Sequence, residues 1–392
     1  MVANFSETLT TKLAVGDLDT DSRSEPSCDV VVAEGDDAIE RAAAEWRAIE
    51  DAGGVASPFQ SLAVARAAGA AHLANGETPR IVTVRERGRP LVIFPTVVGQ
   101  FVGIPTIRFL GDPFIQYGDA IAAPGATPAH LQAAWTAATD ESIASVAIFR
   151  RVRADAVLSP MLARNAATIA EDQAPLVDLQ KAPTLSSHHT RELRRLRRRI
   201  SEQGELRFEI LQGMAANEVL HETFAFKRDW LIQRGLPSVV FGNPRWENVV
   251  FALAGAQCGP TEMMIARLAI DNVTVATEIG FVDRQTWFAY IGALAPGFAK
   301  LGPGHILMDE LITWCRHSGL KIYDLLPPFQ PYKLALTTRA VPLCDYAIAL
   351  GLAGYPAILA ARLIPSAKKL VAKAPLSLRQ KYVRATMCRS DW

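Results

Sequence analysis

The sequence predicts an α+β protein built around a mixed α/β sheet, and two patterns in its second half carry this prediction. Three stretches of alternating apolar residues follow closely on one another, at 262–270, 273–282 and 286–293. A helical pattern at 303–317 then precedes two further strands, at 321–325 and 342–350. Strands joined by turns pair antiparallel and strands joined through a helix can pair parallel, so one sheet would hold both kinds.

The first half shows the same order of elements. It begins with a strand at 30–32, a helix at 36–50 and a second helix that Ser57 caps and Pro58 begins. Strands at 80–87 and 90–98 around a turn at 87–89, a strand at 106–109, a helix at 128–139 and a strand at 145–149 complete this half. The second half has, before its three close strands, a basic helix at 191–203, a strand at 206–211 and helices at 215–234 and 245–257.

Length and composition are those of a two-domain globular protein. The chain has 392 residues, of which 49% are hydrophobic and 21% charged, and this excludes a disordered protein. Its 24 prolines exclude a continuous helical array. We place a flexible N-terminal tail at 1–27, a first domain at 28–183, a second domain at 184–350 and a basic helical tail at 351–392.

Charge is balanced overall but not along the chain. There are 41 Lys and Arg against 40 Asp and Glu, so the net charge of +1 argues neither for nor against a nucleic-acid partner. Residues 1–60 hold 13 acidic and 4 basic side chains, whereas residues 362–392 hold eight basic ones and one aspartate. An anionic surface would therefore be met by the C-terminal end.

Cysteine usage and the absence of a signal-like start predict a cytoplasmic protein. Five cysteines include no C-x-x-C pair, so no disulfide framework is expected. The longest uncharged stretch, 346–361, is interrupted by glycines and a proline, which favours a strand and a helix over a membrane span. The run 361–389 alternates apolar and basic residues and could touch the inner face of an anionic membrane, although simple packing explains it equally well.

A glycine-rich turn is the most informative motif. Gly297, Gly302 and Gly304 follow the strand at 286–293, and a helix begins at Pro303. Glycine lets a ligand approach the backbone closely, and the free N–H groups of a helix start attract phosphate. The turn therefore suits the pyrophosphate of a nucleotide-based cofactor, with an ordinary strand–helix connection as the alternative. It is neither a Walker A loop nor a Rossmann fingerprint. The cofactor-binding candidates are Lys300, Leu301, Gly302, Pro303, Gly304 and His305.

Several short motifs in a fixed order resemble a known family. They are Ser57-Pro58-Phe59-Gln60, Leu110-Gly111 before Tyr117-Gly118-Asp119, an Arg-rich helix, Lys227-x-x-Trp230, Gly302-Pro303-Gly304, Asp324 and Tyr332-Lys333. Over roughly residues 30–350 the chain resembles the acetyltransferases associated with cellulose and exopolysaccharide biosynthesis (the CelD/BcsL group). That group lies within the GNAT acetyltransferase superfamily and is akin to FemABX-like aminoacyltransferases.

The resemblance implies a tandem GNAT-like fold whose second copy holds acetyl-CoA or another acyl-CoA, with no metal. Acyl transfer needs a base, stabilisation of the oxyanion and a proton for the thiolate. The base candidates are Glu278 and Asp324, and Lys333 would meet the oxyanion. Tyr290 or Tyr332 would protonate sulfur. The alternatives are structural: Glu278 paired with an arginine, Tyr290 in the core, and Lys333 partnering a carboxylate.

The Arg-rich helix carries six arginines between residues 190 and 200. Leu193, Leu196 and Ile200 form one apolar stripe, which would turn the arginines outward. Arg194 and Arg198, with Lys227 and Trp230, are the substrate-binding candidates. The arginine face could bind a cofactor phosphate, a glycan or RNA. The alternative is that it is simply exposed to solvent or links the two domains. No aromatic residues interleave with the arginines, so nucleic acid is not expected as a partner.

Together these observations predict an acyl-CoA-dependent acyltransferase that modifies an amine or hydroxyl of a sugar, an exopolysaccharide precursor or another small acceptor. The transferred group would not be aminoacyl. Two alternatives stay open: an aminoacyl-tRNA-dependent transferase of the FemABX type, and a catalytically silent scaffold in exopolysaccharide biosynthesis.

Overall fold

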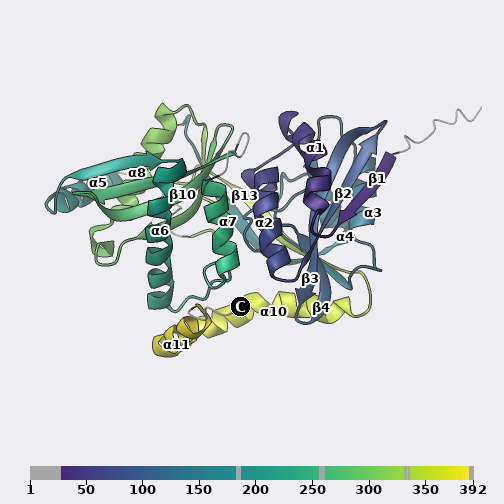
Figure 1. Ribbon diagram of the computed structural model, residues 1–392. Coiled ribbons are helices and arrows are strands. Elements are labelled where there is room, and N and C mark those ends of the chain that lie inside the picture. The colour runs from purple at the N-terminus through teal and green to yellow at the C-terminus, as the bar shows by residue number, and fades with distance from the viewer. Residues whose placement is uncertain (1–27, 182–186, 256–260, 331–332, 334–335, 388–392) are drawn as a thin grey trace, which may run out of the picture.

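Among the residues that the structure describes, thirteen strands form one mixed sheet. The structure, a computed structural model, describes residues 28–181, 187–255, 261–330, 333 and 336–387. Figure 1 shows two lobes side by side with the sheet continuing from one to the other. We call residues 28–181 the first half and residues 187–349 the second half. The predicted α+β class with a mixed sheet is confirmed.

The strands are β1 (Cys28–Glu34), β2 (Thr78–Glu86), β3 (Arg89–Phe101), β4 (Ile104–Phe109), β5 (Ile121–Ala122), β6 (Val146–Arg153), β7 (Ala167–Asp178), β8 (Leu206–Leu211), β9 (Thr261–Ile270), β10 (Val273–Asp283), β11 (Thr286–Leu294), β12 (Ile322–Asp324) and β13 (Arg339–Ala349). The helices are α1 (Ala38–Asp51), α2 (Leu62–Ala74), α3 (Pro128–Ala138), α4 (Ser159–Asn165), α5 (Ser187–Ser201), α6 (Gly213–Arg234), α7 (Pro244–Ala254), α8 (Pro303–His317), α10 (Gly354–Ala372) and α11 (Leu376–Met387), with short 3₁₀ turns η1 (Pro58–Gln60) and η2 (Ala299–Leu301).

The two halves repeat one arrangement of strands. In the first half, β1 to β4 pair antiparallel in sequence order and β6 then lies parallel to β4. In the second half, β8 to β11 do the same and β12 lies parallel to β11. Each half therefore ends in one parallel pair, which needs a crossover connection.

The halves exchange their last strands. β7, from the first half, pairs with β12 of the second, while β13, from the end of the second half, pairs with β6 of the first. β7 and β13 also pair with each other at the centre of the sheet. The boundaries predicted at 28–183 and 184–350 divide the chain but not the sheet, and they stay a prediction.

Two local expectations were wrong in detail. Ser57 does not cap a long helix: its hydroxyl donates to Gln60 Oε1 at 2.6 Å inside η1, and α2 starts at Leu62 with Ser61 as its cap. The reason is tertiary, because the Gln60 amide also donates to the carbonyl of Tyr117 at 2.7 Å. The long strand β7 was not foreseen, since its Ala, Glu and Asp residues have low strand propensity.

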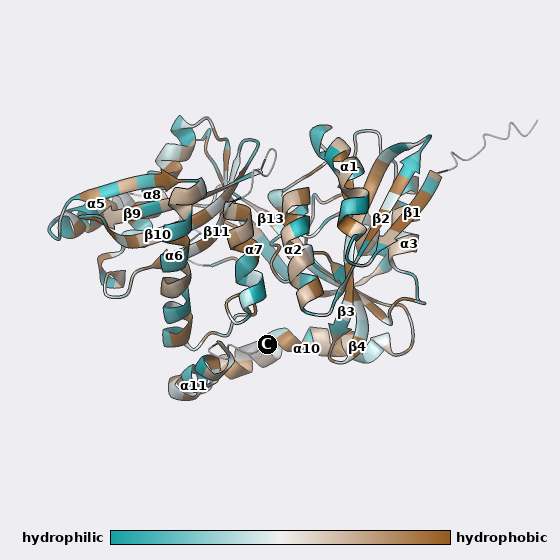
Figure 2. Cartoon of the chain, in the orientation of Figure 1, coloured by the Kyte–Doolittle hydropathy of each residue, from teal (hydrophilic) through white to brown (hydrophobic). Residues whose placement is uncertain are grey.

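Two large clusters of buried apolar side chains lie on opposite faces of the second half's sheet. Phe288 belongs to a cluster that extends into the first half, and Trp287 belongs to one beneath α5 and α8. Successive side chains of a strand point to opposite faces, so β11 contributes to both. Figure 2 shows the corresponding apolar segments along β1, β2, β3 and β11.

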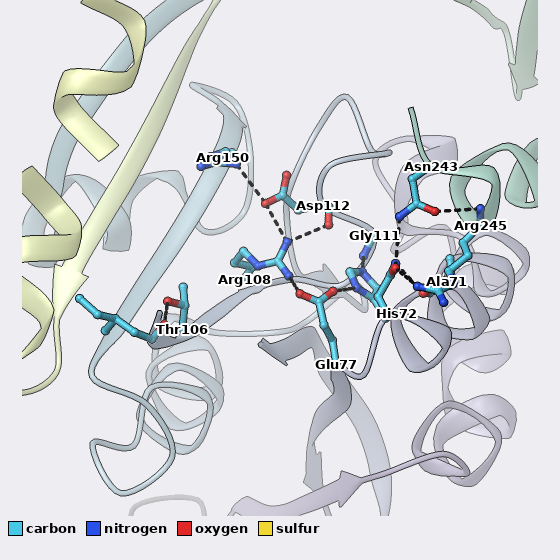
Figure 3. A network of polar contacts seen from close by, with 12 residues as sticks. Ala71, His72, Glu77, Thr106, Arg108, Gly111, Asp112, Arg150, Asn243 and Arg245 are labelled. Atoms are coloured by element: carbon cyan, nitrogen blue, oxygen red, sulfur yellow. Dashed lines mark hydrogen bonds and ion pairs between the residues drawn. The ribbon is translucent and has the colours of Figure 1, made fainter. Parts of the chain in front are cut away.

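A buried polar network holds the loop that follows β4. The Gly111 N–H donates to His72 Nε2 at 2.9 Å, so the His72 Nδ1–H faces Glu77 Oε2 at 2.6 Å (Figure 3). Glu77 in turn bonds Arg108, which donates to the carbonyl of Asp112 at 3.0 Å. Burial lowers the pKa of His72, which keeps its ring neutral. This network anchors the chain just before Tyr117.

The same region joins the two halves. Asn243 and Arg245, at the start of α7, both donate to Asn75 Oδ1 at the end of α2, at 3.2 and 2.8 Å. The Trp246 ring meets His72 edge-on, with 4.9 Å between ring centroids. α2 and α7 therefore pack together, and the lobes are held next to each other at this point.

The last two helices form a strap across both lobes. Figure 1 shows α10 running along one side of the molecule, from the strands of the first half towards the lower end of α6, where α11 lies. Ala357 and Ala361 bury one face of α10 against β6 and β13, and Val383 of α11 is fully buried. Within the part of the chain that the structure describes, no helix is long and apolar enough to cross a membrane.

Candidate active site

The parallel strands β11 and β12 separate to form a fork. They pair only from Thr286–Ile322 to Phe288–Asp324, where β12 ends while β11 continues to Leu294. Beyond Phe288, that edge of β11 has no strand beside it among the described residues. A strand edge without a partner offers N–H and C=O groups to an extended ligand. We call the gap between β11 and the segment after Asp324 the fork.

The glycine turn lies directly beyond the open end of β11. Lys300 and Leu301 lie in η2, Gly302 has a left-handed φ of +68°, and α8 starts at Pro303. Only glycine adopts this backbone without strain. A Cβ on Gly302 would approach the Leu196 side chain to 3.0 Å, so the turn also packs tightly on α5.

The Arg-rich helix α5 lies against this turn. Its predicted stripe is confirmed, because Leu193, Leu196 and Ile200 are all buried. Arg197 bonds Asp309 and Glu310 of α8 and so joins the two helices. The turn and the exposed side of α5 border a cavity of about 270 Å³, lined by Glu192, Leu193, Arg195, Leu196, Ala299, Lys300, Gly302 and His305.

Arg194 and Arg198 both point into solvent from α5, one turn of the helix apart. Neither takes part in the ion pairs that join α5 to α8. Arg195, which lies between them in the sequence, lines the cavity beside the glycine turn, whereas Arg194 and Arg198 are not among its lining residues.

Asp324 lies at the point where the fork opens. Its side chain is 1% exposed, and both carboxylate oxygens accept the hydroxyl of Tyr117, at 2.8 and 2.9 Å. The N–H of Leu326 donates at 2.9 Å and Arg153 Nη1 at 3.3 Å. Burial raises the pKa of Asp324 to about 6, and these donors limit the rise. Such a carboxylate is ionised at neutral pH and still basic enough to accept a proton.

A polar cavity of about 220 Å³ opens on Asp324 from between the two halves. The first half supplies Ser57, Gln60, Tyr117, Asp119, Arg153 and Asp155, and the second half supplies Thr286, Phe288, Ile322, Asp324 and Arg339. Arg153 Nε and Nη2 bond Asp155 at 2.8 and 2.9 Å, and the guanidinium lies 4.9 Å from the centroid of the Tyr117 ring. The cavity thus combines hydroxyl, amide, carboxylate and guanidinium groups.

Glu278 lies on the opposite face of the sheet from this cavity. Its carboxylate accepts Trp287 Nε1 at 2.9 Å and the Tyr323 hydroxyl at 2.8 Å, and both partners belong to the cluster under α8. Burial raises the pKa of Glu278. Glu278 has no arginine among these partners, and it does not line the cavity that contains Asp324.

The ammonium group of Lys333 ties down the segment after Asp324. Lys333 is 6% exposed, and its Nζ donates to the carbonyls of Leu325, Leu326 and Pro328 at 2.8, 2.6 and 3.1 Å. Burial lowers the pKa of Lys333 to about 8, against the attraction of nearby carboxylates. Its neighbour Tyr332 lies outside the described residues.

Lys227, Trp230 and Tyr290 lie near the other side of the fork. Lys227 Nζ donates to the carbonyl of Gly292 at 2.9 Å and lies 4.8 Å from the centroid of the Trp230 ring. Burial lowers the pKa of Lys227 to about 8. The hydroxyl of Tyr290 donates to the carbonyl of Phe114 at 3.0 Å, and burial raises its pKa.

The candidates thus fall into two groups along β11. Lys300, Gly302 and His305 lie at the open end beside Arg195, whereas Asp324, Glu278 and Lys227 lie close enough to Lys333 for their charges to affect its pKa. Sequence reasoning missed Arg153 and Arg339, which carry no local motif. It noted Tyr117-Gly118-Asp119 but assigned these residues no role.

The corresponding fork of the first half is closed by its own chain. β4 and β6 pair only from Thr106 to Arg108, but the loop after β4 then follows β6, with the Gly118 N–H donating to the Arg151 carbonyl at 3.1 Å. Phe114 of this loop is fully buried. A Cβ on Gly118 would lie 2.3 Å from the Phe109 ring, so no space remains there. The second half is therefore the better place for a donor molecule.

Comparison with known proteins agrees with this architecture. Residues 187–334 match the family described as acetyltransferase (GNAT) domain. No curated protein sequence matches the chain. Among solved structures, L-PGS from Bacillus licheniformis aligns over 83% of this chain and 96% of its own, with 15% identity and a TM-score of 0.53.

Two further solved structures align with the chain over most of its length. The C-terminal domain of a protein described as a lysylphosphatidylglycerol synthetase from Agrobacterium fabrum covers 84% of this chain and 96% of its own, with 15% identity and a TM-score of 0.50. A tandem GNAT protein from the clavulanic acid biosynthesis pathway covers 82% and 99%, with 10% identity and a TM-score of 0.48.

The chain therefore has a GNAT-like fold, and its residues 187–334 resemble a GNAT acetyltransferase domain; the predicted fold is confirmed. The particular group associated with cellulose and exopolysaccharide biosynthesis stays a prediction. Among the described residues, no three or more His, Cys, Asp or Glu side chains gather in a way that could hold a metal ion.

Proposed function

We propose that the protein is an acyl-CoA-dependent acyltransferase whose donor lies in the fork and whose acceptor enters the cavity between the halves. The observation that carries this proposal is the position of Asp324. It lies where the fork opens, borders the polar cavity and has a pKa of about 6. A base within reach of both reactants is what acyl transfer to an amine or hydroxyl requires.

The donor end of the fork suits the diphosphate of CoA. Pro303 has no N–H, so Gly304 is the first residue of α8 that can donate one to a ligand, whereas the N–H of His305 already donates to the Gly302 carbonyl at 3.2 Å. A Cβ at Gly304 would lie 3.2 Å from Leu294, so a larger residue would crowd the end of β11 at this point. Lys300, His305 and Arg195 line the adjoining cavity and add cationic or hydrogen-bonding groups.

Acyl-CoA supplies the acyl group as a thioester. In the proposed reaction the acceptor nitrogen or oxygen bonds to the acyl carbon, the carbon–sulfur bond breaks, and Asp324 takes the proton that the acceptor loses. Tyr117 and Arg153 hold the Asp324 carboxylate in place. Tyr290 or Tyr332 as the proton donor to sulfur, Lys333 at the oxyanion and Glu278 as a second base remain proposals.

A sugar or exopolysaccharide precursor is the acceptor that we favour. The Arg153–Asp155 pair and Arg339 line the cavity, and carbohydrates are bound by such charged and hydrogen-bonding groups. A small amine is the alternative acceptor. Cellulose biosynthesis as the cellular setting rests on the family resemblance alone.

Native mass spectrometry of the purified protein, followed by calorimetry with CoA and acetyl-CoA, tests the proposal. We expect acyl-CoA to bind with a stoichiometry of one, and Asp324→Asn to bind it equally well but turn over far more slowly. Absence of binding to any acyl-CoA would instead favour a catalytically silent scaffold.

Aminoacyl transfer is a second candidate, and a specific observation favours it. One structural neighbour is described as a lysylphosphatidylglycerol synthetase and another is named L-PGS, and Arg195 of α5 lines the cavity beside the donor turn. An aminoacyl-tRNA donor would bind with a steep salt dependence, because each neutralised phosphate releases counterions. Filter binding of charged tRNA at two salt concentrations separates it from acyl-CoA.

A further inference from the structure

The strap formed by α10 and α11 exposes an unusual number of large apolar side chains. Along α10 and the residue pair before it, Leu352, Tyr355, Leu359, Leu363 and Leu370 are 88%, 64%, 60%, 56% and 71% exposed. Their spacing of three, four, four and seven residues puts them in one stripe on a helix. The stripe is about 27 Å long at 1.5 Å per residue.

The stripe lies opposite the face with which α10 packs on the molecule. Ala357 and Ala361, about half a turn away, are 0% and 6% exposed and contact the sheet of the first half. Figure 2 shows apolar segments along much of α10. A helix that is apolar on both faces is stable in water only when both are covered. The leucine stripe is therefore a surface suited to a partner outside the described residues.

The charge of the strap indicates what covers it. Between Tyr346 and Met387 the sequence contains seven Lys and Arg and neither Asp nor Glu, although the whole chain carries a net charge of only +1. Lys373, Lys381 and Arg384 are exposed on or between the two helices. Leu378 and Tyr382 extend the apolar surface along α11, at 58% and 59% exposure.

We propose that this strap docks the protein on an anionic lipid bilayer. A narrow apolar stripe on a segment whose charged residues are all cations fits a surface that offers acyl chains below and negative headgroups above. A protein partner would need an apolar groove of the same length with an acidic rim. The proposal concerns a surface made by α10 and α11 and does not depend on the acyltransferase activity.

Sedimentation of the purified full chain with vesicles tests the proposal. We use phosphatidylcholine alone and phosphatidylcholine with phosphatidylserine, because charge and not one particular headgroup is in question. Binding to the anionic vesicles should be at least tenfold stronger than to the neutral ones. Since each basic residue near an anionic surface contributes about fivefold, K373Q/K381Q/R384Q should bind on the order of 100-fold more weakly.

The leucines are tested separately. L359Q/L363Q should lose about tenfold in affinity for each side chain that no longer enters the bilayer, while the melting temperature stays that of the parent. Met214→Gln is the matched control, because Met214 is 88% exposed at the start of α6, outside the strap, and its replacement should change nothing. Equal binding to neutral and anionic vesicles overturns the proposal. Vesicle binding by L359Q/L363Q that is as strong as that of the parent also overturns it. The same holds if the parent binds no vesicles but forms a dimer in solution that L359Q/L363Q converts to a monomer.

Discussion

The phenol hydroxyl of Tyr117 donates to both carboxylate oxygens of Asp324, at 2.8 and 2.9 Å, across 207 residues of sequence and from one half of the molecule to the other. The first half has closed its own fork, and the loop that closes it carries Tyr117. The first half, whose own fork is closed, thus orients the candidate base Asp324 of the second half. The proposed site therefore requires both GNAT-like halves.

Asp324→Asn should lower kcat about 10²–10⁴-fold, because the variant cannot accept a proton. In the parent, kcat/KM should fall as the pH drops through about 6, where Asp324 becomes protonated, and stay level above it. A pH profile with the acceptor at low concentration measures this. If Asp324→Asn keeps kcat within a few-fold of the parent, Asp324 is not the base and another residue must accept the proton.

Tyr117→Phe should shift the acid limb of that profile to higher pH. The hydrogen bond from Tyr117 lowers the pKa of Asp324, so its removal lets burial raise the pKa further. Tyr290→Phe is the control for the position of the limb, which it should leave unchanged whatever its effect on kcat, because the Tyr290 hydroxyl also bridges the halves but bonds a backbone carbonyl. An unmoved limb in Tyr117→Phe would contradict the assignment of the limb to Asp324.

Gly304→Val should weaken acyl-CoA binding at least tenfold while the protein stays folded. The added branched side chain stands at the start of α8, where the diphosphate is proposed to lie, and Leu294 must yield only slightly. Gly255→Val is the control, since a Cβ there meets no atom within 4 Å. Isothermal calorimetry measures both affinities, and unchanged affinity in a folded Gly304→Val protein would exclude this turn as the donor site.

The arginines of α5 should separate into two kinds. Replacing Arg194 and Arg198 with Gln should leave the melting temperature nearly unchanged. It should weaken the binding of an anionic donor and make that binding less dependent on salt concentration. Arg197→Gln should instead cost about 1 kcal/mol of unfolding free energy, because it loses two partly exposed ion pairs with α8. Thermal melts and donor titrations at two salt concentrations compare the two variants. A loss of stability with unchanged donor affinity in the variant of Arg194 and Arg198 would instead give these two arginines a structural role.

Lys333→Met tests whether the lysine acts on the reaction or on the loop. Three backbone carbonyls would lose their donor, so we expect a loss of about 1–3 kcal/mol of unfolding free energy. The acid limb should also move up, because the Lys333 charge lowers the pKa of Asp324. A 10²–10³-fold drop in kcat without loss of stability would instead support the predicted oxyanion role. Lys333→Arg, which keeps the charge, is the control.

The sequence alone was enough for elements with a strong local pattern. The helix predicted at 303–317 and the strand at 206–211 have the bounds that the structure gives them, and the stripe Leu193, Leu196 and Ile200 is buried as expected. These features depend on residues a few positions apart, whose side chains share a face by simple periodicity. The glycine turn belongs to this class too, because the left-handed Gly302 is a local requirement.

Only the tertiary structure decided which of these elements meet. β7 has weak strand propensity and exists because β12 and β13 flank it, so its exchange between the halves left no trace in the local pattern. In the same way, no residue near Asp324 in the sequence predicts its contacts with Tyr117 and Arg153. Glu278 was an equally good candidate base from the sequence, but it faces the other side of the sheet. Periodicity determines which face of an element is buried, whereas the partner across that face depends on how the whole sheet assembles.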